Sequence, residues 1–460
     1  MRRPERSEIH NNSGMRGETN VSDNEKAARS DGPNGASAGP PRSVAVVGMG
    51  YVGLPTALAF HEAGFEVLGL DVSPTRLAAI RDGDVDLLAE DHLRLGVALD
   101  DQARFRLTDD PEVLALADAV LVCVPTPVDH HRVPLLQPLQ AACQAVIDHA
   151  RPGQVIVLTS TSYPGTTRDL LIEPLEAHSL RVGHDVHVAF APERIDPANA
   201  RFPQEQVPRV VGGATPACTT AARDLLAAIT RKLHTVGSPE TAELVKLLEN
   251  TFRAVNIALA NEFAEVCAPL GLDPAEVVEA AATKPYGFMP FYPGPGVGGH
   301  CIPVDPHYLL WHGRAAGLQL PVVEAAMTGI AMRPARVVSQ VAERLSSDGL
   351  GVAGSSVLLV GVAYKPGVQD VREAPALGIW SGLAARGAQV SYFDPFVPQL
   401  RIDGAERHSE RTLDPAAYDL VVVCTRHPEV DYAVLSEARR LLDHTYRTAA
   451  APHGSLIRAA

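Results

Sequence analysis

Near its amino end the chain reads Val44-Ala-Val-Val-Gly48-Met-Gly50-Tyr-Val-Gly53, a short apolar run that opens into Gly-x-Gly-x-x-Gly. A helix-like stretch follows from Leu54 to Ala63, and after Gly64 a second apolar run, Glu66 to Leu70, ends at Asp71. The glycine fingerprint indicates dinucleotide binding only in a particular context. That context is a strand, a helix and a second strand in this order, with an acidic residue about twenty positions beyond the glycines. The stretch therefore predicts a βαβ unit that binds a dinucleotide.

The same unit indicates which dinucleotide it binds. Glycine permits the tight turn that leaves a pyrophosphate against the helix amino terminus, where free N–H groups and the helix dipole favour an anion. A carboxylate at Asp71 suits ribose hydroxyls and repels a 2′-phosphate, so NAD is favoured, while the nearby Arg76 keeps NADP as the alternative. The predicted cofactor-binding residues here are Gly48, Met49, Gly50, Tyr51, Val52, Gly53, Asp71 and Arg76.

A second glycine-rich stretch lies between Tyr292 and Pro306 and reads Tyr-Pro-Gly-Pro-Gly-Val-Gly-Gly-His-Cys-Ile-Pro-Val-Asp-Pro. Its glycines allow close approach of backbone to a ligand because they carry no Cβ. Cys301 follows them directly, and Asp305 comes shortly after. A soft nucleophile with a nearby carboxylate predicts a covalent active site. The alternative is a surface loop with an inert cysteine.

Composition limits the class of protein. A chain of 460 residues with 46% hydrophobic and 20% charged residues predicts a globular protein of two or three domains. The net charge of −14, without a long Lys/Arg run, argues against a nucleic-acid partner. No stretch approaches eighteen apolar residues, so no membrane span is predicted. Residues 1–41 are polar and lack the apolar core of a signal peptide, which predicts a disordered tail and a cytoplasmic location.

The cysteines are far apart and form no Cys-x-x-Cys pair, which argues against structural zinc and a disulfide framework. Most lie in apolar segments and are interpreted as small buried side chains. No metal site is predicted.

From Ser43 to about Thr235, short β-branched runs alternate with longer amphipathic stretches, which predicts a mainly parallel sheet with helices on both faces. Ligands of such sheets bind at the carboxyl ends of the strands. Two loops fall there and add Pro125, Thr126 and Thr161 to the cofactor-binding candidates. The clearest further strands are Ala119–Val124, Gln154–Thr159, Asp185–Phe190 and Arg209–Gly212.

A long helix is predicted from Ser238-Pro239 to about Ala268, with serine as its cap and proline in its first turn. About thirty residues at 1.5 Å each give a length of about 45 Å. Because the helix is apolar on more than one face, we expect it to join domains or to form a dimer interface.

A second α/β block begins near Ser355, with strands at Val357–Gly361, Gln389–Phe393 and Leu420–Cys424. It lacks Gly-x-Gly-x-x-Gly. Its first strand instead runs into a loop that carries Lys365 and Arg372, which suit a second phosphate group. The alternative is a solvated charged loop.

Together these motifs resemble the UDP-glucose/GDP-mannose dehydrogenase family, over nearly everything from Ser43 to about Arg447. The resemblance is carried by Gly48–Gly53, the Pro-Thr-Pro loop, Ala191-Pro-Glu193, Lys246 with Asn250, the Gly-Gly-x-Cys301 loop, and Lys365 through Pro375. It implies an α/β fold of two Rossmann-like, doubly wound parallel-sheet domains joined by a long-helix dimerisation segment. The implied divisions are a tail (1–41), an NAD-binding domain (42–236), a central segment (237–340) and a UDP-sugar-binding domain (341–460).

The resemblance also implies an activity: oxidation of the C6 alcohol of a UDP-hexose to a carboxylate, with consumption of two NAD, by a homodimer. Cys301 matches the family nucleophile, and Asp305 the carboxylate that handles protons. Lys246 and Asn250, four apart on one helix face, would stabilise an oxyanion. A nearby ammonium is expected to lower the thiol pKa below about 8.5. Thr161 and Glu193 match residues that position water. The implied substrate-binding residues are Glu193, Arg194, Lys246, Asn250, Tyr292, Gly294, Gly298, Gly299, His300, Lys365 and Arg372.

Two departures from the UDP-glucose enzymes concern the sugar. Glu193 is followed by Arg-Ile-Asp196-Pro197, so a second glutamate is absent, and His300 stands where those enzymes carry an aromatic residue. Both features resemble the UDP-N-acetylglucosamine 6-dehydrogenase branch, while UDP-N-acetylmannosamine dehydrogenases share Gly-Gly-His-Cys. UDP-glucose and UDP-N-acetylmannosamine therefore stay open as substrates. A one-step alcohol dehydrogenase and a non-catalytic nucleotide-sugar binding protein are the alternatives of other classes.

Overall fold

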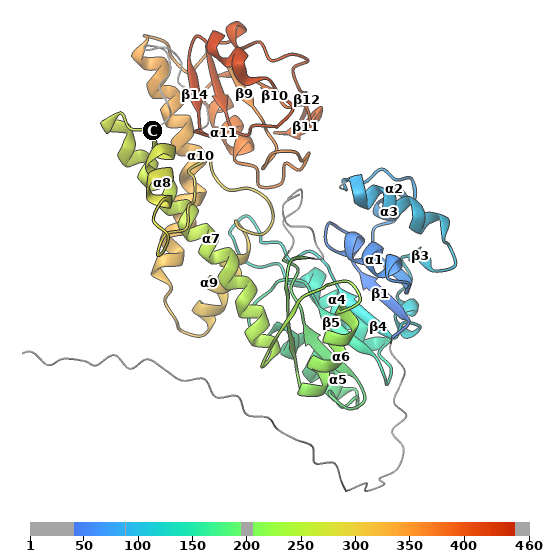
Figure 1. Cartoon of the computed structure of the whole chain (residues 1–460). Coiled ribbons are helices and arrows are strands. Elements are labelled where there is room, and N and C mark those ends of the chain that lie inside the picture. Colours follow the sequence, from blue (N-terminus) through green and yellow to red (C-terminus); the bar gives the residue numbers. More distant parts are fainter. Residues whose placement is uncertain (1–40, 88, 195–205, 447–460) are drawn as a thin grey trace, which may run out of the picture. The chain divides into compact units, whose positions relative to one another are not determined.

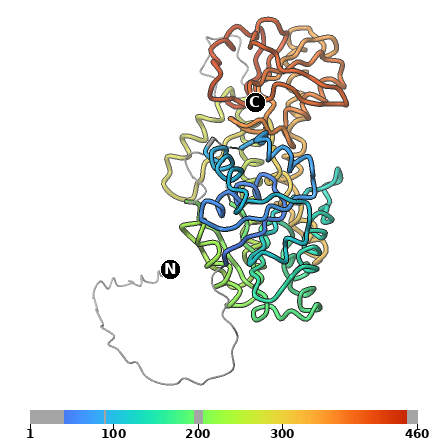
Figure 2. The backbone as a smooth tube through the Cα atoms, turned by 90° about the vertical axis from the view of Figure 1, so that its right-hand side faces the viewer, coloured from blue at the N-terminus to red at the C-terminus, as the bar shows by residue number. Residues whose placement is uncertain are grey.

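The computed structural model describes residues 41–87, 89–194 and 206–446 (Figure 1). Residues 1–40 of the expected tail lie outside the described residues, as do Asp196 and Pro197. Figure 2 follows the backbone from blue, where the first sheet begins, to red, where the second sheet ends. In the described part of the chain, no helix combines the length and the apolar character needed to cross a bilayer.

The first sheet contains eight strands among the described residues, in the order β3-β2-β1-β4-β5-β6-β7-β8. All neighbours are parallel except β6 and β7, which pair antiparallel. The order reverses between β1 and β4, and this is where doubly wound sheets bind their ligands. The strands are β1 (Ser43–Val47), β2 (Glu66–Leu70), β3 (Phe105–Thr108), β4 (Ala119–Val122), β5 (Val155–Leu158), β6 (His187–Phe190), β7 (Arg209–Gly213) and β8 (Leu233–Val236).

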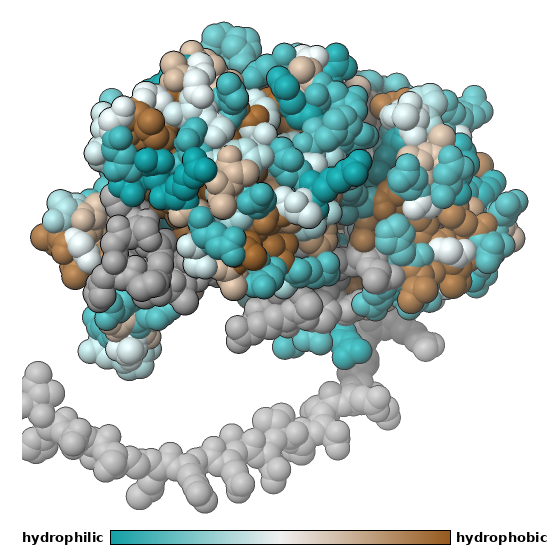
Figure 3. All heavy atoms as spheres, turned by 90° about the horizontal axis from the view of Figure 1, so that it is seen from above, coloured by the Kyte–Doolittle hydropathy of each residue, from teal (hydrophilic) through white to brown (hydrophobic). Residues whose placement is uncertain are grey.

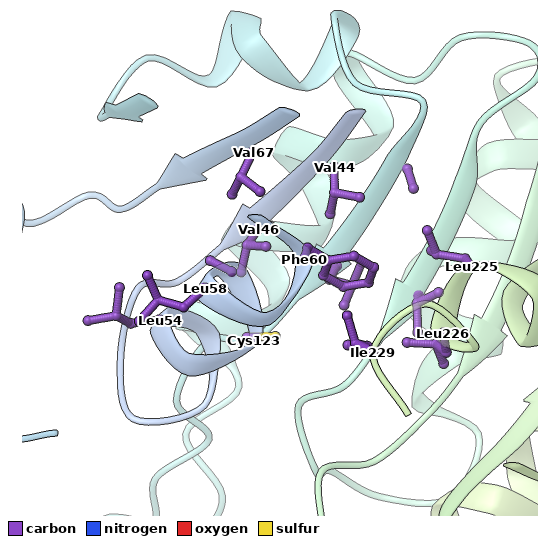
Figure 4. Packing of buried hydrophobic residues seen from close by; sticks show 14 of the residues in the cluster. Val44, Val46, Leu54, Leu58, Phe60, Val67, Cys123, Leu225, Leu226 and Ile229 are labelled. Atoms are coloured by element: carbon purple, nitrogen blue, oxygen red, sulfur yellow. The ribbon is translucent and has the colours of Figure 1, made fainter. Parts of the chain in front are cut away.

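Both faces of this sheet are buried. Along β1, Val44 and Val46 belong to one apolar cluster, whereas Ala45 and Val47 belong to another. Figure 4 shows part of the first cluster, where Phe60 packs near Val44 and Val46. Burial on both faces is why these strands read as continuous apolar runs. The accompanying helices are α1 (Gly53–Glu62), α2 (Pro74–Arg81), α3 (Ala89–Asp100), α4 (Gln137–Asp148), α5 (Glu173–Ala177) and α6 (Pro216–Leu226).

The expected long helix is present as α7 (Pro239–Cys267), and the Ser238 hydroxyl accepts a hydrogen bond from the Thr241 N–H at its start. It packs against β6 and β7 at one end of its course and against α9 and α10 further on. The remaining central helices are α8 (Pro274–Ala282), α9 (Asp305–Ala315) and α10 (Pro321–Ser347).

The second sheet has the order β10-β9-β13-β14, and its strands are parallel. Its apolar cluster includes Val337 of α10 and Trp380 of α11. The elements are β9 (Ser356–Val360), α11 (Pro375–Ala384), β10 (Gln389–Phe393), β13 (Leu420–Val423) and β14 (Leu441–Asp443), with a hairpin of β11 (Gln399–Ile402) and β12 (Ala405–His408). The chain thus has the predicted fold: two Rossmann-like sheets and a long central helix.

Candidate active site

The glycine turn after β1 is held by the two charged residues predicted beside it. Asp71 accepts hydrogen bonds from the Met49 N–H at 2.8 Å and from the Ser73 N–H at 2.9 Å. The Arg76 Nε donates to the Met49 carbonyl at 2.8 Å. Both side chains therefore lie at the turn, on the side where β2 ends.

The residues of this turn fit a dinucleotide. A Cβ at Gly48 (φ +89°) would lie 2.8 Å from the Cys123 carbonyl oxygen, and one at Gly53 would lie 1.8 Å from the Gly48 carbonyl oxygen. A Cβ at Gly50, in contrast, would have no neighbour within 4 Å. No side chain caps α1. The open glycine and the uncapped helix terminus are what a pyrophosphate needs.

Cys301 lies immediately before α9. The N–H groups of Val304 and Asp305 donate to its carbonyl oxygen at 3.1 and 2.8 Å. Among the six cysteines it alone is exposed. Cys123 is buried, and burial raises the pKa of its thiol to about 12. The interpretation of most cysteines as buried packing residues is thus confirmed.

The charges around Cys301 correct one expectation. Protein atoms crowd its sulfur although the residue has exposed surface, and this desolvation, with the Asp305 charge, raises the thiol pKa to about 11. The charges of Lys246, Arg372 and Arg253 act in the opposite direction but are outweighed. The predicted depression of the pKa is therefore wrong for the free protein, and the thiol needs a base.

Asp305 is placed to be that base. It is 3% exposed, and burial raises the pKa of its carboxyl to about 6. The Asn250 Nδ2 donates to its Oδ2 at 2.5 Å. A carboxylate that titrates near neutrality can accept a proton and release it again at physiological pH.

Lys246 stands one turn before Asn250 on α7 and is 9% exposed. Within the described residues it has no hydrogen-bond or ion-pair partner, and its charge acts on both Cys301 and Asp305. The structure thus brings four predicted catalytic residues together.

The loop that carries Thr161 is anchored to α7 by Glu243, which sequence reasoning missed. The buried Glu243 carboxylate accepts hydrogen bonds from the Gly165 N–H (2.6 Å), the Thr167 N–H (2.8 Å) and the Thr167 hydroxyl (2.6 Å). Glu243 precedes Lys246 by one turn, so the anchor fixes this loop relative to the ammonium. An acidic residue on the buried face of the helix was the signal available in the sequence.

The Pro-Glu-Arg turn is fixed by two more residues that were not predicted. Arg209 of β7 donates to the Glu193 carboxylate. Arg194 makes two hydrogen bonds to Glu249 of α7, at 2.6 and 3.1 Å, and a third to the Pro208 carbonyl at 2.6 Å. The guanidinium of Arg194, predicted to bind substrate, is thus engaged by protein groups.

Three glycines of the catalytic loop pack closely against the second α/β block, where a side chain would not fit. A Cβ at Gly296 would lie 2.9 Å from Pro375, and one at Gly298 would lie 2.5 Å from Tyr364. A Cβ at Gly299 would meet the Tyr364 ring at 3.0 Å. At Gly294 the nearest atom would be 3.8 Å away, so this glycine retains space beside it.

Gly294 itself is held on both sides. Its N–H donates to Asn261 Oδ1 at 2.9 Å, and its carbonyl accepts from Arg333 Nε at 2.9 Å. Arg333 also contacts Glu265 at 3.1 Å and the Tyr446 hydroxyl at 3.2 Å. Helices α7 and α10 together therefore set the course of the loop.

Arg372 connects the catalytic loop with the glycine turn of the first sheet. Its carbonyl accepts from the Gly299 N–H at 2.9 Å, and its guanidinium donates to His300 Nε2 at 2.7 Å. The same guanidinium lies 4.3 Å from the centre of the Tyr51 ring, within cation–π range. Burial and the Arg372 charge lower the pKa of His300, so its ring is a neutral acceptor here.

The other predicted residues lie around this centre. Pro125 and Thr126 precede Pro127, whose carbonyl accepts from the Tyr308 hydroxyl of α9 at 3.1 Å. Lys365 is half-buried in the loop after β9, and Tyr292 is exposed.

Comparison with known proteins gives matches along nearly the whole described chain. Models of the UDP-glucose/GDP-mannose dehydrogenase family match residues 42–230 as the NAD binding domain, 240–329 as the central domain and 358–448 as the UDP binding domain. UDP-N-acetyl-D-glucosamine 6-dehydrogenase of Pseudomonas aeruginosa is 34% identical over 406 residues, which cover 86% of this chain and 93% of that protein.

Solved structures agree on the fold. The UDP-D-ManNAc dehydrogenase of Pyrococcus horikoshii has a TM-score of 0.81 at 30% identity, covering 90% of this chain and 98% of the other. A UDP-glucose dehydrogenase of Pyrobaculum islandicum has a TM-score of 0.75 at 28% identity, covering 88% and 94%. The three relatives carry names with three different sugars.

Proposed function

Because the chain belongs to the UDP-glucose/GDP-mannose dehydrogenase family and is an NAD-dependent UDP-sugar dehydrogenase, we propose that it oxidises the C6 alcohol of UDP-N-acetylglucosamine to the uronate. The observation that supports covalent chemistry is the buried ammonium of Lys246, which has no partner among the described residues and lies beside Cys301 and Asp305. In this proposal residues 42–236 bind NAD, 237–340 carry the catalytic loop, and 341–460 bind the nucleotide sugar.

The residues of the site divide the reaction between them. When bound, NAD accepts a hydride from C6 in each oxidation. In the first, the C6–H bond breaks and the hydroxyl proton passes to Asp305, while Lys246 stabilises the charge that develops on the oxygen. Once Asp305 has released that proton to solvent, Cys301 sulfur bonds to the aldehyde carbon and the thiol proton passes through Asp305 to the aldehyde oxygen, giving a thiohemiacetal. Loss of a second hydride and the hydroxyl proton gives a thioester, and water releases the uronate and restores the thiol.

The choice of sugar rests on two sequence features. Glu193 is followed four residues later by Pro197 and not by a second glutamate, and His300 stands directly before the nucleophile. His300 replaces a bulkier aromatic residue, and the absent glutamate frees space and removes a negative charge, so both changes leave room for a 2-acetamido group. UDP-N-acetylmannosamine is the second candidate, because the Pyrococcus horikoshii structure, at a TM-score of 0.81, belongs to an enzyme of that name.

A screen of NADH formation tests this proposal. Wild-type protein is assayed with UDP-glucose, UDP-N-acetylglucosamine, UDP-N-acetylgalactosamine, UDP-N-acetylmannosamine and GDP-mannose. We expect the highest kcat/KM with UDP-N-acetylglucosamine, because a site that hydrogen-bonds the acetamido group discriminates by up to about 10⁴-fold against sugars without it. A higher kcat/KM with UDP-glucose would contradict the sugar assignment and leave the oxidation chemistry intact.

A further inference from the structure

Arg209 is a buried charge at the start of β7, with its side chain 2% exposed. A buried guanidinium is costly unless it is paired. Its partner is Glu193, to which Nη2 donates, while Nη1 has no hydrogen-bond partner among the described residues. Arg209 is therefore not saturated by structural contacts, in contrast to Arg194.

Glu193 is held at both carboxylate oxygens. One accepts from Arg209, and the other accepts from the Arg194 N–H at 2.8 Å. The side chain of Glu193 is 10% exposed, so it retains access to a ligand. The Arg194 guanidinium donates to the Pro208 carbonyl at 2.6 Å, which ties the turn to the residue that directly precedes β7.

The contacts that hold Glu193, made by Arg209 and Arg194, are connected to the reacting cysteine through α7. Arg194 pairs with Glu249, which is adjacent to Asn250, and Asn250 donates to Asp305 beside Cys301. Cys123 lies close enough to feel both charges of the Arg209–Glu193 pair, but burial raises its thiol pKa to about 12. Cys123 is thus a neutral neighbour and does not compete for the guanidinium.

We propose that Arg209 is a positioning residue for the second half of the reaction: it aims the Glu193 carboxylate at the thioester on Cys301. This inference rests on the proposed function. The water oxygen bonds to the acyl carbon while one water proton passes to Glu193. The C–S bond breaks with its electron pair on sulfur, which takes the proton back from Glu193. The new carboxylic acid releases its proton to solvent.

Trapping of the thioester tests the inference. Full-length Arg209→Met is mixed with NAD and the UDP-sugar that wild-type protein oxidises, and the mixture is quenched for intact-mass measurement. We expect one burst of NADH at the wild-type rate and then turnover slowed by about 10²-fold, the usual contribution of a general base. The protein should accumulate a uronyl adduct, which Cys301→Ser cannot form. Arg181→Met, which changes a surface arginine paired with Asp185, is the matched control and should behave as wild type.

Conservative variants separate positioning from folding. Arg209→Lys should restore part of the hydrolysis rate, and Glu193→Gln should trap the same adduct. If Arg209→Met does not fold, Arg209→Lys decides, because it too should accumulate adduct. Since the two residues act as one unit, the double variant Arg209→Met/Glu193→Gln should be no slower than either single variant.

The outcomes that overturn the inference are distinct from failure of the proposed function. Arg209 would have only a structural role if Arg209→Met lost the NADH burst and the steady turnover to the same extent. The same conclusion would follow if Arg209→Met turned over normally and accumulated no adduct. Absence of NADH from wild-type protein with every UDP-sugar would overturn the proposed function and this inference together.

Discussion

The proton on Cys301 is the first obstacle to covalent chemistry. With its pKa raised to about 11, the sulfur is a neutral thiol at pH 7. Asp305, with its pKa raised to about 6, is then mostly ionised and can accept that proton. Burial thus weakens the thiol as an acid while it makes the neighbouring carboxylate a better base.

Activity should therefore depend on the ionised form of Asp305. That form predominates above pH 6 and is lost below it, so kcat/KM should fall about tenfold per pH unit on the acid side, with an apparent pKa near 6. The check is a profile of kcat/KM from pH 4.5 to 8. Asp305→Asn should remove both the acid limb and most of the activity. A rate that stays level down to pH 4.5 would exclude Asp305 as the base.

Sequence reasoning located the residues whose chemistry is local. The roles of the glycine turn, Asp71 and the Gly-Gly-His-Cys301 loop could each be predicted from the residues a few positions away. Arg209, Glu243 and Glu249 were missed because the partner of each charge lies far away in the sequence, as Gly165 does from Glu243. Pairing of that kind exists only in the folded chain.

At the scale of elements, the catalytic loops are pinned to one helix. Glu243, Glu249 and Asn250 of α7 hold, in turn, the Thr161 loop, the Pro-Glu-Arg turn and Asp305. Helix α7 was predictable from its cap and its length. Helix α10 was not predicted, because Pro334 lies inside it and a proline normally ends a helix.

The turn after β9 in the second sheet resembles the glycine turn after β1 in the first sheet, but its carboxylate has an additional partner. A Cβ at Gly361 (φ +80°) would lie 2.0 Å from the Thr425 carbonyl oxygen, where one at Gly48 would lie 2.8 Å from a carbonyl oxygen. Asp394 accepts from the Val362 N–H at 2.7 Å, as Asp71 does from the Met49 N–H. Here, however, His427 Nε2 lies 3.1 Å from Asp394, which is fully buried. The second block, which lacks Gly-x-Gly-x-x-Gly, thus differs from the first in that the carboxylate corresponding to Asp71 is paired with a histidine inside the protein.

The anchor made by Glu243 gives a prediction at this scale. Glu243→Gln retains one acceptor oxygen for the Gly165–Thr167 loop and should lower the free energy of unfolding by about 1–3 kcal/mol. The matched control is Glu240→Gln on the same helix, where a partly exposed pair with Arg168 should contribute about 0–1 kcal/mol. Denaturant unfolding measures both. Equal effects of the two changes would contradict the role of Glu243 as an anchor.

At the scale of the whole molecule, apolar side chains interrupt the hydrophilic surface, as on the face in Figure 3. A row of them is exposed along α7 at spacings of three, four and seven residues, a helix-packing seam. We propose that this seam joins two copies in a symmetric dimer. Its residues are Leu244, Leu248, Phe252, Leu259, Phe263 and Val266.

Charges in the seam should separate the dimer. Leu248→Glu combined with Phe263→Glu should shift the sedimenting mass from two chains to one, because the new carboxylates face their symmetry copies in an apolar interface. Leu93→Glu, on the exposed side of α3, is the matched control and should leave the mass unchanged. A wild-type protein that sediments as a monomer at micromolar concentration would contradict the seam.

The central claim is that one site oxidises C6 twice through Cys301. Its most direct test is the number of NADH formed per UDP-N-acetylglucosamine at complete conversion, with the product identified by mass. Two NADH and a uronate are predicted for wild-type protein, and Cys301→Ser should lose nearly all turnover while it still binds NAD. One NADH per sugar with a free aldehyde, or a near-normal rate in Cys301→Ser, would contradict the account.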